Sequence, residues 1–114
     1  MITIEEDRIT IYPAIEKIWL TQHQIADTFG VFTGRISSNI RAILKADILD
    51  EREVCRLHRY DDSNSVEMYN LEMIAALAFR LNSRKAKQFR KWLIRQTSKP
   101  VTVWKMPSID TSLN

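Results

Sequence analysis

Two runs of hydrophobic residues recur at helical spacing in the first half of the chain and are separated by a glycine. The first run predicts a helix over residues 22–29, whose inward side carries Ile25 and Phe29. The second run repeats at the i, i+4 and i+7 positions of one helix face, at Ile36, Ile40 and Ile43. We expect the apolar sides of the two helices to share a core.

The residues that bound the first helix predict a sharp turn before the second one. The hydroxyl group of Thr21 can cap the first helix, and Gly30 can take the left-handed conformation that ends it without a Cβ penalty. Ala26 is small enough to let a second helix cross closely. This arrangement is typical of a helix-turn-helix, although an ordinary amphipathic hairpin with a solvated face shows the same pattern.

The side of the second helix opposite Ile36 is polar, because successive residues turn by about 100°. Arginine can pair with guanine or with phosphate, serine can bond to either, and a glycine lets the backbone approach closely. The candidates for contacts with DNA bases are therefore Gly34, Arg35, Ser37, Ser38 and Arg41.

The N-terminal residues alternate between apolar and polar types. One pair of isoleucines, Ile2 and Ile4, precedes a polar break, and a second pair, Ile9 and Ile11, follows it. This pattern predicts one or two short strands. Residues 14–20 then lead into the first helix.

A β-hairpin is predicted on the C-terminal side of the helix pair. After the second helix ends near Ala46, residues 47–53 are expected to be a connector. Residues 54–60 and 65–69 alternate in polarity and flank residues 61–64, which are turn formers. A hairpin in this position is typical of the wing of a winged helix-turn-helix domain.

Two further helices follow the hairpin. Asn70 can cap a helix over residues 71–81, and Ser83 can cap another over residues 84–97. Their inward faces are expected to carry Leu71, Ile74, Ala75, Ala78 and Leu81 in the first helix and Ala86, Phe89 and Leu93 in the second. Arg90 lies at the edge of the apolar face, where we expect an internal salt bridge or a bond to a helix terminus.

These patterns together predict the fold class. We expect an α+β, winged helix-turn-helix-like single domain over residues 1–100, with a β-hairpin wing and two C-terminal helices. Residues 101–114 are expected to form a strand-like segment and a polar tail.

Charge is distributed unevenly along the 114 residues, whose formal net charge is only +3. Residues 79–99 contain eight basic and no acidic side chains, whereas residues 61–78 contain four acidic and no basic ones. A basic block beside a helix-turn-helix is the expected footprint of a phosphate-binding surface. The candidates for phosphate contacts are Thr21, Gln22, Gln24, Lys45, Arg56, Arg59, Arg84, Lys87, Lys91 and Arg95.

Residue spacing gives no indication of catalysis. His23 and His58 do not have the spacing of metal ligands, and Cys55 has no evident histidine partner. We therefore expect no enzymatic activity, no metal and no cofactor. A single cysteine excludes an internal disulfide, and no apolar run is long enough to cross a membrane, so a cytoplasmic location and no membrane partner are expected.

Several sequence blocks resemble a known family. The run Trp19-Leu-Thr-Gln22, the helix-turn-helix, and the blocks Tyr69-Asn-Leu71, Phe79-Arg-Leu-Asn-Ser83 and Phe89-Arg-Lys-Trp92 together resemble the N-terminal module of RhuM-type virulence-associated proteins, over about residues 19–95. The resemblance implies a winged-helix-like DNA-binding module of the kind carried by phages and mobile elements. Phe32 stands where the family tends to have a capping serine, so we expect Thr33 to cap the second helix.

The sequence thus favours a non-enzymatic protein that binds double-stranded DNA, as a transcriptional regulator of a mobile or phage-derived element. Homodimerisation is an open possibility. The alternative is a protein-interaction module, antirepressor-like or antitoxin-like, that uses the helix-turn-helix scaffold to bind a protein partner. An enzymatic role remains open only as a subunit of a larger assembly, because a scaffold does not determine a function.

Overall fold

Five α-helices and two small antiparallel sheets enclose one apolar core in the described part of the computed structural model, which covers residues 1–6 and 8–97. The elements follow in the order β1 (Ile2–Glu5), β2 (Arg8–Ile11), the 3-10 helix η1 (Ile15–Lys17), β3 (Trp19–Thr21), α1 (Gln22–Phe29), α2 (Thr33–Lys45), α3 (Glu51–Val54), β4 (Cys55–Arg59), β5 (Ser65–Asn70), α4 (Leu71–Ala78) and α5 (Arg84–Thr97). The chain is therefore a compact α+β domain.

The two helices predicted in the first half of the chain are confirmed. Thr21 and Gln24 form a capping box at the start of α1, and Gly30 ends the helix with a φ of 66° and a ψ of 40°. In α2 the three predicted core residues, Ile36, Ile40 and Ile43, are all buried. Only residues 30–32 separate α1 from α2.

The expected cap of α2 is wrong. Phe32 has the extended backbone of an N-cap residue, and no side chain caps the helix there. Thr33 cannot serve as the cap because the short turn already places it inside the first turn of α2. Its Oγ1 instead lies 3.3 Å from the Nδ1 of His23 on α1.

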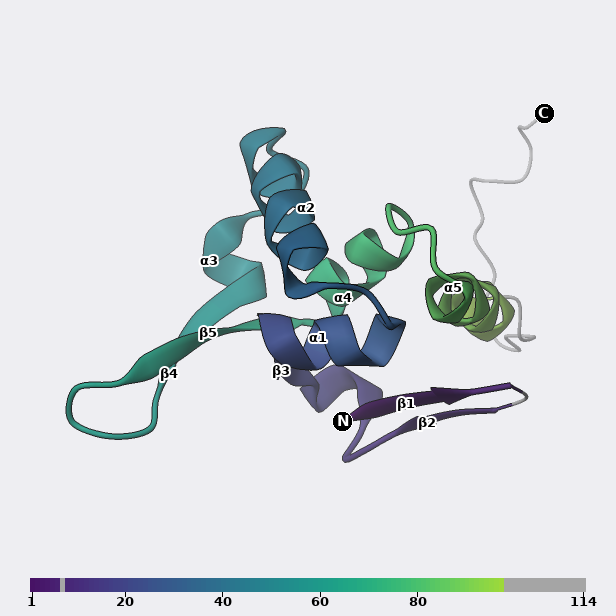
Figure 1. The fold of residues 1–114 in the computed structure, drawn as a ribbon, viewed down its shortest axis with the longest axis horizontal. Helices are drawn as coiled ribbons and strands as arrows, with labels where there is room; N and C mark the ends of the chain where they lie inside the picture. The colour runs from purple at the N-terminus through teal and green to yellow at the C-terminus, as the bar shows by residue number, and fades with distance from the viewer. Residues whose placement is uncertain (7, 98–114) are drawn as a thin grey trace, which may run out of the picture.

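The N-terminal strands are confirmed as a hairpin that packs on the helices. β1 pairs with β2 in antiparallel register, with Ile2 opposite Ile11 and Ile4 opposite Ile9. Ile2 and Ile4 are buried, and β1 contacts both α1 and α5. Figure 1 shows this hairpin beneath α1 and α5.

The hairpin predicted after the helix pair is confirmed, but the sheet to which it belongs is larger. β5 lies between β4 and β3 in a three-stranded antiparallel sheet, in which Leu20 of β3 is opposite Tyr69. The sequence did not predict β3, because a strand of three residues is too short to show alternation. Both Leu20 and Tyr69 are buried, so this part of the sheet belongs to the core.

The expected connector contains a short helix, α3. Its N-cap is Asp50, whose Oδ1 accepts a hydrogen bond of 3.0 Å from the backbone N–H of Arg52. The helix is only four residues long and buries a single side chain, that of Val54. Such a helix has no repeat that a sequence could reveal.

The two C-terminal helices form with one change of length. α4 ends at Ala78, three residues before the predicted end, and it buries Met73 and Leu77 in addition to part of the predicted face. α5 begins after Ser83, whose Oγ accepts a hydrogen bond from the backbone N–H of Ala86. The predicted boundary at residue 100 and the segment 101–114 lie outside the described residues.

The core joins elements that are distant in the sequence. The rings of Phe29 on α1 and Phe89 on α5 meet edge to face, with centroids 5.6 Å apart. Phe89 also stacks on Trp92. The described residues bury no polar or charged residue, so the polar side chains of α2, α5 and the β4–β5 hairpin all lie at or near the surface.

Candidate nucleic-acid interface

The outer side of α2 is the polar surface that the sequence predicts. All the residues that the helical rotation places opposite the core are exposed: Gly34, Ser38, Arg41 and Lys45. Arg35 is also exposed, and Ser37 is half-buried. Because α2 contains three basic and no acidic residues, this surface is positively charged along the whole helix.

Hydrogen bonds within α2 involve three of the candidate side chains. The Nη1 of Arg41 donates a bond of 3.0 Å to the Oγ of Ser37, one turn earlier. The Oγ of Ser38 donates a longer bond of 3.4 Å to the carbonyl oxygen of Arg35. Arg41 and Ser37 therefore present their polar atoms as one unit.

Gly34 has no structural need to be a glycine. A Cβ atom built on it would meet nothing within 4 Å, and its φ is not positive. Gly30, in contrast, has a left-handed backbone that a side chain would strain. The open space above Gly34 leaves the α2 backbone accessible from outside.

A contact that the sequence does not reveal connects α2 to the loop after α4. The Nε of Arg80 donates a hydrogen bond of 2.8 Å to the Oδ1 of Asn39. The Nδ2 of Asn39 in turn donates to the carbonyl oxygen of Arg35, also at 2.8 Å. Arg80 thereby adds a further positive charge beside α2, 41 positions away in the chain.

The start of α1 lies beside the start of α2 and the β4–β5 hairpin. A groove there is lined by residues of all three segments, including Gln22, Thr33 and Leu57. Two of the predicted phosphate contacts, Thr21 and Gln24, are engaged in the capping box, where each accepts a bond from the other's backbone N–H. In these two bonds the side chains act only as acceptors, so the hydroxyl hydrogen of Thr21 and the Nε2 of Gln24 can still donate to an external acceptor.

Gln22, the third candidate on α1, contacts a buried tyrosine. Its Nε2 donates a bond of 3.4 Å to the hydroxyl of Tyr69, which donates to the Oε1 of Glu67 at 3.2 Å. Burial raises the pKa of Tyr69 to about 12, although the bond from Gln22 acts in the opposite direction. The phenol is therefore neutral at physiological pH and stays a hydrogen-bonding group.

The two arginines predicted on the hairpin point to opposite faces of it. Side chains alternate along a strand, so Arg59 shares the face of Cys55 and Leu57, which borders the groove beside α1 and α2. Arg56 lies on the other face, where its guanidinium carbon is 4.2 Å from the ring centroid of Trp19. The structure therefore brings only Arg59 to the side of α2.

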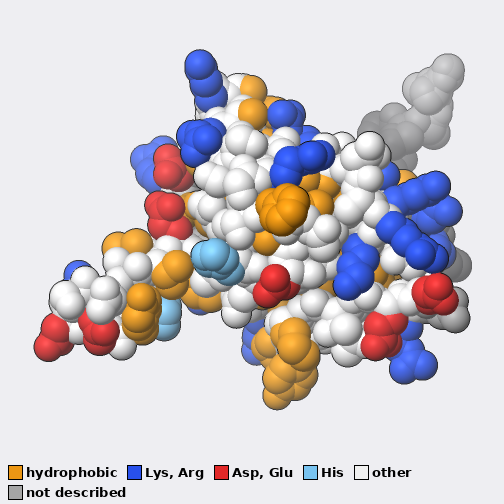
Figure 2. All heavy atoms as spheres, viewed as in Figure 1, with side chains coloured by type: hydrophobic (Ala, Val, Ile, Leu, Met, Phe, Trp, Pro, Cys, Tyr) orange, Lys and Arg blue, Asp and Glu red, His pale blue; other side chains and the backbone are white. Residues whose placement is uncertain are grey.

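The tip of this hairpin is acidic. Asp61 and Asp62 are both exposed there, and Figure 2 shows acidic side chains at the end of the hairpin. The Oδ1 of Asp61 accepts bonds from the backbone N–H groups of Ser63 and Asn64 at 2.9 and 2.8 Å. Hydrogen bonds from the Asn64 side chain, together with these backbone bonds, lower the pKa of Asp61, so its carboxylate is negatively charged at neutral pH.

The basic side chains predicted on α5 are exposed but not equivalent. Figure 2 shows Lys and Arg side chains gathered over this end of the molecule. Arg84 is 3.3 Å from the carboxylate of Glu6, whereas no ion pair of the described residues involves Lys87, Lys91 or Arg95. The sequence could not reveal the Arg84 pair, because Glu6 lies 78 positions earlier.

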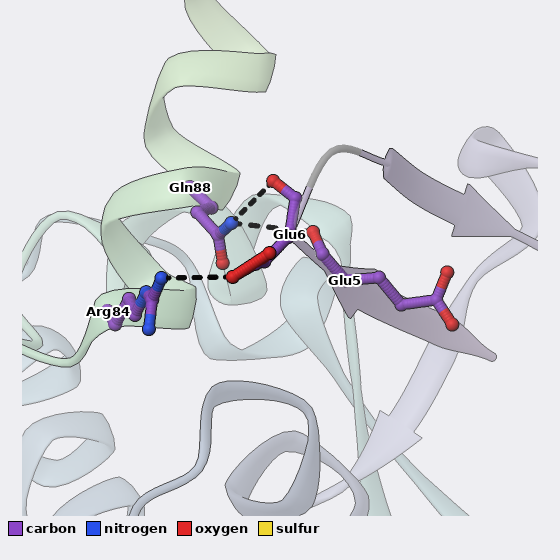
Figure 3. Close-up of polar contacts among 4 residues, drawn as sticks. All are labelled: Glu5, Glu6, Arg84 and Gln88. Carbon is purple, nitrogen blue, oxygen red and sulfur yellow. Dashed lines mark hydrogen bonds and ion pairs between the residues drawn. The ribbon is translucent and has the colours of Figure 1, made fainter.

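Gln88 strengthens the contact between α5 and the β1–β2 turn. Its Nε2 donates hydrogen bonds to the carbonyl oxygens of Glu5 and Glu6, at 3.4 and 2.9 Å. Figure 3 shows the Glu6 carboxylate facing Arg84 while the side chain of Glu5 points away from both. One carboxylate thus offsets part of the positive charge at the start of α5.

The expectation for Arg90 is confirmed. Its Nη1 donates to the carbonyl oxygens of Ala78 and Leu81 at 2.7 and 2.8 Å. These groups belong to the C-terminal end of α4 and the following turn, where helix carbonyls lack partners within the helix. Arg90 is half-buried, and it joins α5 to α4.

One small cluster holds possible metal-ligand atoms. Glu51, Cys55 and Glu67 place these atoms within 4.8 Å of one another. Burial, followed by the carboxylates of Glu67 and Glu51, raises the pKa of the Cys55 thiol, which disfavours the thiolate needed for metal binding or attack on a substrate. Cys55 packs against the core, as expected for a strand residue, and both glutamates are exposed. We assign no metal site to this cluster.

No family model, curated protein or solved structure matches this chain. Within residues 1–6 and 8–97, no helix is both long and apolar enough to cross a membrane.

Proposed function

We propose that this chain is a non-enzymatic winged helix-turn-helix protein that binds double-stranded DNA, with α2 as its recognition helix. The observation that carries this proposal is the exposed outer side of α2, where Arg41, Lys45 and the adjacent Arg35 supply three positive charges and the helix has no negative one. α2 follows a short glycine turn and precedes a β-hairpin, which is the order of a helix-turn-helix with a wing. Regulation of transcription from a mobile or phage-derived element is the role that the RhuM-type resemblance implies.

The first half of α2 is suited to base contacts. In helix-turn-helix proteins the N-terminal residues of the recognition helix contact base edges. Here these residues include Gly34, which lets the backbone approach, and Arg35, which is exposed. Arg41 follows two turns later with its guanidinium group beside the Ser37 hydroxyl. A guanidinium group in this position could form hydrogen bonds with guanine.

Phosphate contacts would surround the exposed side of α2. Lys45 lies at the far end of α2, the first turn of α1 lies beside its beginning, and Arg80 lies against Asn39. On α5 the exposed Lys87, Lys91 and Arg95 supply attraction that does not depend on sequence. On the β4–β5 hairpin Arg59 would contact the DNA backbone, whereas the acidic tip would lie away from the phosphates.

The direct test is a titration of fluorescently labelled mixed-sequence duplex DNA with the purified protein. Binding is measured by fluorescence anisotropy at about 50 and about 200 mM salt. We expect binding at low salt and an affinity that falls by about tenfold or more at high salt, because bound counterions are released from the phosphates. Absence of binding at low salt would contradict the proposal and favour the protein-interaction alternative. Selection from a random duplex library would then give the preferred site, and two symmetric half-sites would indicate a homodimer.

A further inference from the structure

Phe32, the residue immediately before α2, exposes its aromatic ring to an unusual extent. Its exposed fraction is 88%, and the next most exposed large hydrophobic side chain of the described residues is Tyr12 at 69%. Single exposed apolar residues are common on protein surfaces. Phe32 stands out because it is exposed and also occupies the N-cap position of a helix.

The N-terminus of α2 lacks a side-chain cap. An N-cap residue normally offers a side-chain oxygen to the first free N–H groups of the helix, and phenylalanine has none. Phe32 occupies the N-cap of α2 with no side-chain bond, while Thr21 and Asn70 cap α1 and α4. The folded chain therefore gains neither burial nor capping from this residue. Places where local rules fail without compensation are candidates for functional residues.

The surroundings of Phe32 indicate what its ring could contact. It lines an open groove with Arg35, Asn82 and Ser83, between the first turn of α2 and the loop before α5. Its carbonyl oxygen accepts the backbone N–H of Arg35 at 2.9 Å, which keeps both residues at the same end of α2. An exposed apolar ring thus lies beside an exposed guanidinium group, at the end of α2 that would enter the groove of DNA.

We propose that Phe32 reads thymine, by packing its ring against the C5-methyl group that thymine presents in the major groove. This inference rests on the proposed function, because it requires α2 to enter the major groove. The methyl group is the only apolar feature that distinguishes one base pair from another there, and phenylalanine is among the side chains that contact it. Arg35, at the same end of the helix, would contact a neighbouring guanine or phosphate.

The test compares thymine with deoxyuridine, which pairs identically but lacks the methyl group. Each thymine of the selected duplex is replaced singly, and the dissociation constants of the wild type and of Phe32→Ala are measured on every duplex. At one or two positions we expect the wild type to lose about fourfold in affinity, the value of one buried methyl group. Phe32→Ala should bind the two duplexes equally at those positions.

Two control variants separate this effect from a change in folding. Phe32→Leu keeps an apolar side chain and should retain part of the discrimination, and Tyr12→Ala, which removes another exposed ring, should discriminate like the wild type. If no single replacement affects the wild type, or if Phe32→Ala discriminates equally well, the thymine assignment is wrong although DNA binding stands. If the wild type binds no duplex at low salt, the proposed function and this inference are both wrong.

Discussion

Arg80 and Asn39 are joined by a hydrogen bond of 2.8 Å from Nε to Oδ1, which fixes the loop after α4 against α2. The other end of the Asn39 amide donates to the carbonyl oxygen of Arg35. With both ends of the amide engaged, Asn39 supports α2 and holds a positive charge beside it. Its neighbour Ser38, on the exposed side, is the better candidate for contact with DNA.

We expect this bond to contribute about 1 kcal/mol to the free energy of unfolding, the value of a typical intramolecular hydrogen bond, because solvent screens the charge of Arg80 at this exposed position. A double-mutant cycle of Arg80→Ala and Asn39→Ala, followed by urea unfolding of all four proteins, isolates it. The two single variants should each be destabilised, and the double variant by less than their sum. If the effects of the two substitutions are additive, the contact contributes nothing to the free energy of unfolding.

Arg41 should determine part of the base preference. Arg41→Ala is expected to weaken binding to the selected site by about 1–3 kcal/mol and to relax the preference at one base pair. The measurement compares the selected duplex with single-base variants of it. Lys17→Ala, which removes a positive charge outside the proposed interface, is the matched control. A loss that is equal for all sequences would make Arg41 a phosphate contact.

The α5 surface should affect the salt dependence of binding rather than its sequence preference. Each phosphate contact contributes about 0.9 to the slope of log affinity against log salt concentration, so Lys87→Ala and Lys91→Ala should each reduce the slope by up to that amount. Glu6→Gln removes the carboxylate that pairs with Arg84 and should strengthen non-specific binding. Unchanged slopes in the two lysine variants, together with an unchanged non-specific affinity of Glu6→Gln, would place α5 outside the interface.

Gly34 should show opposite effects on stability and binding. Gly34→Ala meets no atom of the chain within 4 Å, and alanine is favoured over glycine in a helix by roughly 0.5–1 kcal/mol. Thermal unfolding should therefore show a more stable protein, whereas the added methyl group should hinder the approach of α2 to DNA and weaken binding. If the variant binds DNA as well as the wild type does, close approach at Gly34 plays no part.

The local features of the sequence predicted the elements well, and the long-range contacts had to come from the structure. Capping residues mark the starts of α1 and α5, and the repeat of Ile36, Ile40 and Ile43 marks α2, so the bounds of these helices were predictable to within a residue or so. β3 and α3 are too short for a repeat, and packing rather than local preference forms them. The exposed row of α2 follows from helical rotation alone.

The relations between candidate side chains depend on tertiary structure. Arg84 was predicted as a free phosphate contact, yet Glu6 lies beside it because the β1–β2 turn packs on α5. Arg56 and Arg59 look alike in sequence, but the strand register turns them to opposite faces. The Arg80 contact and the exposure of Phe32 likewise depend on how α2 meets its neighbours, and no local pattern encodes that.

The most direct test of the account is an NMR titration of the isotope-labelled full chain with duplex DNA at low salt. Shift changes of backbone amides map the binding surface residue by residue. We predict the largest changes at residues 32–41 of the turn and α2, with smaller ones at the start of α1 and on α5. Changes confined to other surfaces, or none on addition of excess duplex, would contradict the assignment of α2 as a recognition helix.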